Sequence, residues 1–208
     1  IPIKKINNLL KKQTNYQTML EDKILEYDFL IDLYSRNKNN LINQINNFSA
    51  IANTPQKTFF IDEQPPQYLI KNCFPGFSVD TKEYTKAIAE HNMPFAISEL
   101  HSGAPFGFVL SKENLLMSNY NQVEEIFTQV DYPDEYPQAE VKPGGRYLNI
   151  VLPNKYPSNE INTALAQFVE YLSINKLSSC GGLHIITLYS NPYNSHAECF
   201  TKLSIHLS

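Results

Sequence analysis

The chain has 208 residues, of which 42% are hydrophobic and 18% charged, and this balance argues against an intrinsically disordered protein. Its net charge of −4 gives no general reason to expect nucleic-acid binding along the whole chain. No apolar run approaches the ~20 residues of a membrane span, so we expect no membrane association. Three cysteines are too few for a disulfide framework and favour a reducing, cytoplasmic setting. The chain begins with Ile1 instead of Met, which suggests a fragment of something longer.

The first quarter of the chain has the periodicity of a long amphipathic helix. Its apolar residues step by three and four, with only Lys38 out of line, and the stripe they form comprises Leu20, Ile24, Tyr27, Ile31, Tyr34, Leu41, Ile45 and Phe48. Upstream the stripe fails at Gln13 and Gln17, so we expect a short helix over 3–12, a break, and a second helix over about 18–52. The stripe either packs on its own domain or pairs with a second copy. Its length favours a homodimer.

After residue 53 the pattern changes from helical to mostly extended. Runs of β-branched and aromatic residues, bounded by Pro, Gly, Asn or Asp, predict four strands at 57–61, 67–73, 106–111 and 122–130. A helix should begin between them near Asp80, because Asp80 and Glu83 have the spacing of a capping box. Pro94 should kink or end that helix.

The second half of the chain repeats this plan. Strands are predicted at 136–141, 146–153, 182–190 and 198–208, with an amphipathic helix over 158–177. Two successive units of strands, helix and strands predict an α+β fold with an antiparallel sheet, built as a pseudo-duplicated pair.

The order of these segments resembles a known family. A long helix, then FFIDEQPPQYLIK, KPGGRYLNIVLP, a helix, CGGLHIITLYSNP and a closing ECFTKLSIHL strand is similar to the C-terminal part of MerR-type transcription regulators, the GyrI-like or multidrug-binding domain. The resemblance implies three parts: the tail of a DNA-binding domain in 1–17, a dimerisation helix or coiled coil in 18–53, and an effector-binding domain in 54–208. DNA binding would belong to the full-length protein, and the helix of a second subunit would cover the apolar stripe.

The resemblance also implies a ligand site. Family members bind amphipathic, often cationic aromatic molecules in a cleft between the two repeats, where ring faces stack on the ligand. Tyr147 matches an aromatic position that lines the pocket in related proteins, and Tyr68, Phe106 and Phe108 are further candidates. The alternative for each is core packing, because successive strand residues point to opposite faces.

This chain departs from the family at one position. The family's cation binders usually carry a buried glutamate on the strand that corresponds to GLHIITLYSNP, where this chain has Ile186 or a neighbour. Glu99 and Glu198 could supply the missing acid from adjacent elements, and His184 could offer a neutral or switchable partner. The alternatives are exposed carboxylates and a half-buried strand histidine.

Other chemistry finds little support in the sequence. The HAEC run at 196–199 has no second pair at ligand spacing, so no metal is expected. PGGR and CGG lack the residues of a phosphate-binding loop or dinucleotide fingerprint, so no cofactor is expected, nor any catalytic residue. Two alternatives to a regulator stay open: a stand-alone ligand-binding or protein-inhibitory module, and a hydrolase of reactive small molecules. The missing strand glutamate counts against the hydrolase.

Overall fold

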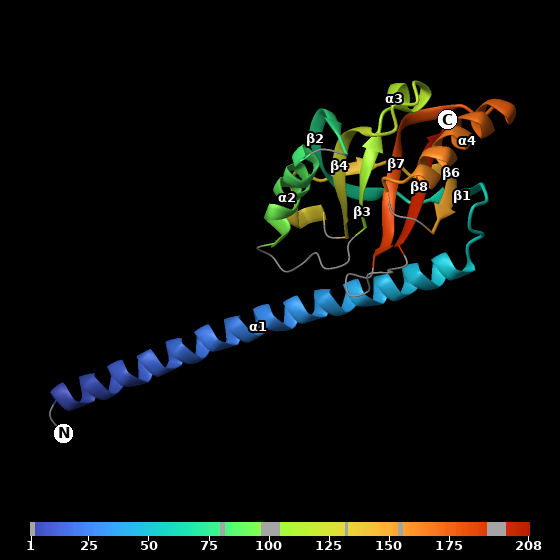
Figure 1. Ribbon diagram of the computed structural model, residues 1–208. Coiled ribbons are helices and arrows are strands. Elements are labelled where there is room, and N and C mark those ends of the chain that lie inside the picture. The colour runs from blue at the N-terminus through green and yellow to red at the C-terminus, as the bar shows by residue number, and fades with distance from the viewer. Residues whose placement is uncertain (1–2, 80–81, 97–104, 132, 154–155, 191–198) are drawn as a thin grey trace.

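The computed structural model describes residues 3–79, 82–96, 105–131, 133–153, 156–190 and 199–208. A long helix, α1 (Ile3–Asn53), is followed by an α+β domain (Figure 1). The helices of the domain are α2 (Lys82–Ala96), α3 (Lys112–Leu116) and α4 (Asn159–Ile174), with a short 3-10 helix, η1 (Pro133–Glu135). Its strands are β1 (Phe60–Gln64), β2 (Gln67–Ser78), β3 (Phe106–Leu110), β4 (Gln122–Val130), β5 (Glu140–Lys142), β6 (Gly145–Leu152), β7 (Ser179–Ser190) and β8 (Cys199–Leu207).

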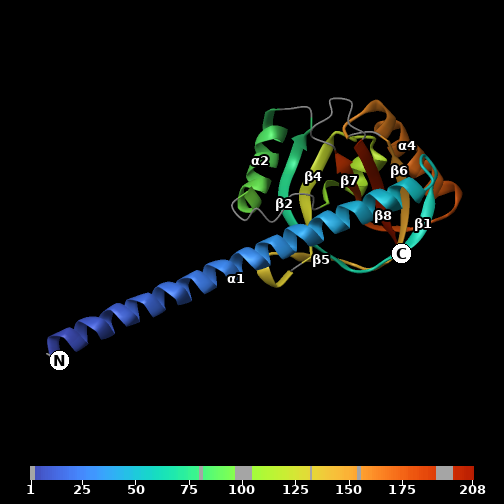
Figure 2. The ribbon, with the colours of Figure 1, turned by 90° about the horizontal axis from the view of Figure 1, so that it is seen from below.

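These strands form one antiparallel sheet in the order β1-β6-β8-β7-β3-β4-β2-β5, which confirms the predicted fold class. The predicted duplication is also visible. The units β2-α2-β3-β4 and β6-α4-β7-β8 each place their last strand between the other two. The units meet where β3 pairs with β7, with Phe108 opposite Ile185. Both α2 and α4 lie on the same side of the sheet (Figure 2).

One large core fills the space between the helices and the sheet. Ile161, Leu165 and Phe168 recur at helical spacing along α4, and all three are fully buried in this core with strand residues such as Leu148. Ser158 caps the helix, because its Oγ accepts a hydrogen bond from the Ile161 backbone N–H at 3.3 Å. The helices therefore cover one face of the sheet and leave the other for different contacts.

The long helix differs from its prediction in one respect. It runs without interruption from Ile3 to Asn53, so the break predicted at residues 13–17 is absent. The gap in the apolar stripe affects the packing of the helix at this point and not its backbone. Gln, Thr, Asn and Tyr are not helix breakers, and the segment holds neither Gly nor Pro. The C-terminal end of α1 passes along the strand ends, and its N-terminal part extends away from the domain (Figures 1 and 2).

The second helix of the sequence is close to its prediction. It begins at Lys82 and extends to Ala96, so Pro94 lies within its last turn. Pro94 cannot donate to the carbonyl of residue 90 and its ring crowds that carbonyl, which is consistent with α2 ending at Ala96. Asp80 lies outside the described residues, so the predicted capping box with Glu83 is untested.

Several predicted strands differ in extent. The strand expected at 67–73 continues to Ser78, and the strand expected at 182–190 begins at Ser179. The strand expected at 57–61 begins at Phe60, because Lys57 adopts a φ of 58° and turns the chain out of α1. The strand expected at 136–141 shrinks to the three residues of β5. Pro137 lacks a backbone donor, and this part of the chain forms turns. The short helix α3 was not predicted from the sequence.

Candidate functional site

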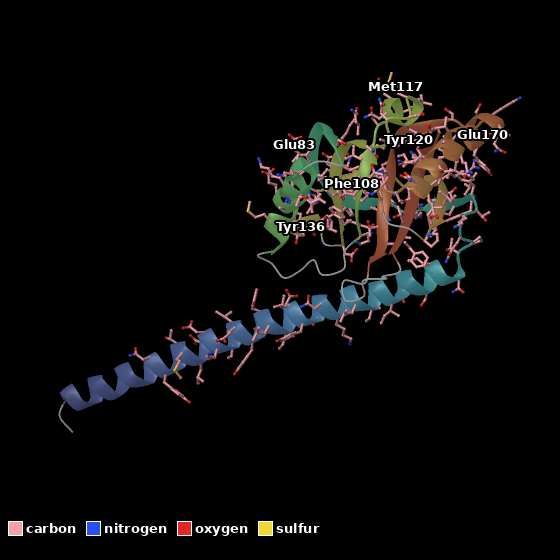
Figure 3. The ribbon with its side chains drawn as sticks, in the orientation of Figure 1. Glu83, Phe108, Met117, Tyr120, Tyr136 and Glu170 are labelled. Atoms are coloured by element: carbon pink, nitrogen blue, oxygen red, sulfur yellow. The ribbon has the colours of Figure 1, made fainter. Side chains whose placement is uncertain are left out.

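The alternation of side chains along the strands sorts the predicted site residues onto two faces. Phe106 and Phe108 lie on the face that α2 and α4 cover, where Phe108 packs against Tyr84 of α2 and Tyr156. Figure 3 shows Phe108 in the middle of the domain. Tyr68 shares that face, since it pairs with Val130, and it is 38% exposed. None of these three predicted ligand-binding residues lies beside Tyr147.

Tyr147 lies on the opposite face of the sheet, which we call the polar face. The residues of this face that concern the site are Asp62, Lys71, Phe127, Lys142, Tyr147, Asn149, His184, Ile186, Lys202, Ser204 and His206. They come from β1, β2 and β4 to β8, so the polar face joins both repeats. Glu99 and Glu198, the two acids proposed as substitutes for the missing glutamate, lie outside the described residues.

The ring of Tyr147 sits inside an aromatic and cationic stack. It is only 1% exposed, and its hydroxyl donates a hydrogen bond to the Pro143 carbonyl at 2.6 Å. The His206 ring stacks on it, with 4.9 Å between ring centroids, and the Lys142 Nζ lies 4.4 Å from the ring centroid. Burial raises the pKa of Tyr147 to about 12, so the phenol stays protonated. Gly145 is required beside the stack, because a Cβ there would meet His206 Nε2 at 2.7 Å.

Lys142, in β5, is the most unusual group of the polar face. The residue is only 4% exposed. Its ammonium donates hydrogen bonds to two neutral oxygens, Gln64 Oε1 at 3.1 Å and Gln67 Oε1 at 3.0 Å. No carboxylate among the described residues lies within ion-pair distance of it. Burial and the charge of Lys202 lower the pKa of Lys142 to about 8, and Asp62 offsets them only in part.

Asp62, at the edge of the same face, is already engaged. One of its oxygens accepts from the Asn149 amide at 2.8 Å and from the Gln64 amide at 2.9 Å. The other lies 3.8 Å from Lys202 Nζ, a long ion pair. Burial lowers the pKa of Lys202, and the nearby Asp62 partly compensates. Lys202 therefore has only a distant counter-charge.

Lys71 differs from Lys142 and Lys202 because it forms ion pairs with two carboxylates. Its Nζ lies 3.2 Å from Glu125 and 3.3 Å from Glu140. Burial opposes its charge, but these two carboxylates outweigh burial and raise the pKa of Lys71. Both glutamates are thus committed to one lysine.

His184 and Ser204 are neighbours across the β7–β8 pair. His184 Nδ1 and Ser204 Oγ are both buried without a hydrogen-bond partner in the described part of the chain. The His184 ring packs edge-on against Phe127, with 5.4 Å between ring centroids. Burial, followed by the charges of Lys142 and Lys71, lowers the pKa of His184 to about 3, so the imidazole is neutral.

Ile186, which stands near the family's glutamate position, is partly buried against Phe127, Leu69 and Val109. Across the strand pair it lies opposite Lys202. An apolar side chain beside a lysine thus replaces the acid that the resemblance leads one to expect. The polar face brings ammonium groups, hydrogen-bond donors and aromatic rings together in one place.

Sequence reasoning missed Lys142, Lys202, Asp62 and His206. The two-residue alternation of Lys202, Ser204 and His206 in one strand was visible, but the sequence does not say which strands lie side by side. The burial of Lys142 depends on the pairing of β5 with β2, which no local pattern encodes.

A hollow lies between α3 and α4, away from the polar face. It measures about 450 Å³ and is lined mainly by the side chains of Leu115, Leu116, Val169, Leu172 and Lys112 and by the turn after α4. None of the described groups lacking a hydrogen-bond partner belongs to it. No set of three or more His, Cys, Asp or Glu in the described residues could hold a metal ion, and no described helix is long and apolar enough to cross a membrane.

No protein-family model and no curated protein sequence matches this chain. Among solved structures, the chain matches EcmrR in the EcmrR–DNA complex with a TM-score of 0.52 and 15% identity, covering 100% of this chain and 78% of that one. The EcmrR C-terminal domain matches with a TM-score of 0.49 and 16% identity over 73% of this chain and 97% of that one. A hydrolase from Listeria innocua matches with a TM-score of 0.46 and 12% identity over 77% and 96%. The last two scores are too low to carry an argument, and the first shows that this chain shares the fold of the matched part of EcmrR.

Proposed function

We propose that this chain is the effector-sensing part of a MerR-type transcription regulator, in which a small amphipathic aromatic molecule binds on the polar face of a GyrI-like domain. The observation that carries the proposal is the buried cluster around Tyr147, where ring faces and unpartnered polar atoms occur together on a face shared by both repeats. The likeness of the whole chain to EcmrR in its DNA complex supports a regulator over an enzyme. The role is binding and not catalysis, and its setting is the cytoplasm.

The proposed regulator works as a homodimer through α1. Seven predicted stripe residues have described side chains, and each is between 44 and 67% exposed; they are Leu20, Ile24, Tyr27, Ile31, Tyr34, Leu41 and Ile45. The side chain of Phe48 lies outside the described set. An apolar stripe of this length is rarely left in water, and an antiparallel copy of the same helix presents a matching stripe. The DNA-binding segment of the regulator would precede Ile1.

A direct connection joins the polar face to α1. Ile51, near the end of α1, is 4% exposed and packs with Val151 and Phe200. Val151 lies on the same strand and the same face as Tyr147, four residues further along β6. A ligand that shifts Tyr147 would therefore press on the strand against which α1 is seated. This connection produces allostery only if the ligand binds the two arrangements of α1 with different affinity.

Calorimetric unfolding of the chain with a panel of aromatic compounds of each charge tests the proposal. A compound at ~100 times its Kd should add about 2.7 kcal/mol to the free energy of unfolding and raise Tm by several degrees. Because the chain has no Trp, a fluorescent aromatic ligand can be followed without interference from tryptophan emission. If none of the compounds raises Tm, the chain does not sense a small aromatic molecule.

A further inference from the structure

Among the described residues, the charges of the polar face do not balance around Lys142. Glu125 and Glu140 both pair with Lys71, and Asp62 is held by Asn149, Gln64 and Lys202. Lys142 is left with two neutral glutamine oxygens for a buried ammonium. A buried charge without a counter-charge is costly, and an anion brought in by a ligand would remove that cost.

The same face holds hydrogen-bond donors without acceptors. Ser204 has a hydroxyl proton to give, and neutral His184 can carry its proton on Nδ1, where no partner in the described part of the chain fixes the tautomer. The two residues lie opposite each other on adjacent strands, a separation of about 5 Å between backbones. One carboxylate, with two oxygens, can accept from both.

The lysines and the histidine act on one another electrostatically. The charge of Lys142 lowers the pKa of His184, and the charge of Lys202 lowers that of Lys142. These mutual effects show that the three groups share one electrostatic environment on the polar face. A cationic ligand would add a further positive charge to this group, whereas an anion would be attracted by each member.

We infer that the effector is an aromatic anion whose carboxylate binds between Lys142, Lys202 and the His184–Ser204 pair, with its ring against the aromatic side chains of the polar face. This inference rests on the proposed function and names the ligand class of the same site. The partly exposed His206 ring, which stacks on the buried Tyr147, supplies the ring face. Lys202 and His184 are partly exposed, so the ligand enters past them, and the flexible Lys142 side chain turns its ammonium from the glutamines to the carboxylate.

Three compounds that share a ring and differ in charge test the inference: naphthoate, neutral naphthamide and naphthylmethylammonium. By titration calorimetry on the intact chain, naphthoate should bind about tenfold or more tightly than the amide, and the ammonium compound most weakly. Tighter binding of the amide or the ammonium compound would overturn the anion preference and leave the proposed function standing. Binding of none of the three would overturn both.

Variants locate the site. Lys142→Met and Lys202→Met should each weaken naphthoate binding about tenfold or more and leave naphthamide binding within about twofold, since each removes a charge and keeps an apolar stem. Lys86→Met, on the exposed surface of α2, removes the same charge away from the polar face and should change neither affinity. Lys142→Arg, which keeps the charge, should retain the preference for the anion. If both Met variants fold and bind naphthoate as tightly as the unmodified chain, the anion does not bind here.

Discussion

His184 and Ser204 stand opposite each other on β7 and β8, and each buries a polar atom that has no hydrogen-bond partner in the described part of the chain. Buried polar groups are nearly always paired in folded proteins, because leaving one unpaired costs about 1–3 kcal/mol. The pair lies on the polar face, which also carries Lys142, a lysine with no ion-pair partner among the described residues. These unpaired groups lower the stability of the folded chain, and a ligand that paired with them would raise it.

The stability of the chain should depend on pH through Lys142. The pKa of Lys142 is about 8 in the folded chain, below its usual 10.5. Between these two values the folded state therefore binds fewer protons than the unfolded state. The contribution of Lys142 to stability thus rises as pH rises through this window. From about pH 7.5 to about pH 10 the gain is about 2 kcal/mol at most. Urea unfolding at both pH values measures it.

Lys142→Met isolates this effect, since the variant lacks the titrating group and keeps the apolar stem. The difference in unfolding free energy between the chain and the variant should shift by about 2 kcal/mol in favour of the chain at the higher pH. Equal pH dependence of the two proteins would show that the Lys142 ammonium is not penalised in the fold.

Because Gly145 lies close to His206, adding a single methyl group at residue 145 should destabilise the chain. Gly145 has a φ of 139°, and a Cβ there would lie 2.7 Å from His206 Nε2. Gly145→Ala should therefore displace His206 from the Tyr147 ring and cost about 1–3 kcal/mol in stability. The His206 ring proton shifts, measured by NMR, report on the loss of stacking.

Gly181→Ala is the matched control, because Gly181 also has a positive φ, 71°, but a Cβ there meets nothing within 4 Å. It should cost about 1 kcal/mol from backbone strain alone and leave the His206 signals in place. A Gly145 variant that costs no more than the Gly181 variant would mean that His206 moves freely and does not hold the Tyr147 ring.

Much of the fold was predictable from local pattern, and the site was only partly so. The strand predicted at 122–130 has the observed bounds, and the helix around Leu165 was evident from its spacing, because alternation and helical periodicity are local signals. Tyr147 reached the list of candidates through family resemblance. Lys142 did not, since its burial arises from contacts with Gln64 and Gln67, more than 70 residues away in sequence. The strand pattern of β3 likewise did not show which face of the sheet the rings of Phe106 and Phe108 would occupy. The order of the strands in the sheet decides that.

Ile51 should be the residue that seats α1 on the domain. Ile51→Ala removes most of a buried side chain from a small cluster with Val151 and Phe200, and should cost about 2–4 kcal/mol in the docking of the end of α1. Hydrogen exchange of backbone amides in the last turns of α1 should accelerate, and ligand affinity at the polar face should change with it, because the proposed coupling acts in both directions. Leu25→Ala, at a residue 66% exposed, is the control and should leave exchange near residue 51 unchanged. Unchanged exchange in the Ile51 variant would contradict the proposed route from β6 to α1.

The exposed stripe of α1 predicts that the chain self-associates. Replacing Ile31 and Ile45 together by Asp puts two charges on the stripe, where they would be buried against a second helix, so the variant should elute as a monomer while the unmodified chain elutes as a dimer. Asn39→Asp with Asn46→Asp adds the same two charges at exposed residues outside the stripe, and this variant should stay dimeric. Light scattering on a sizing column distinguishes the two states. If the double Ile variant remains a dimer, the copies meet through another surface and α1 is covered by something else.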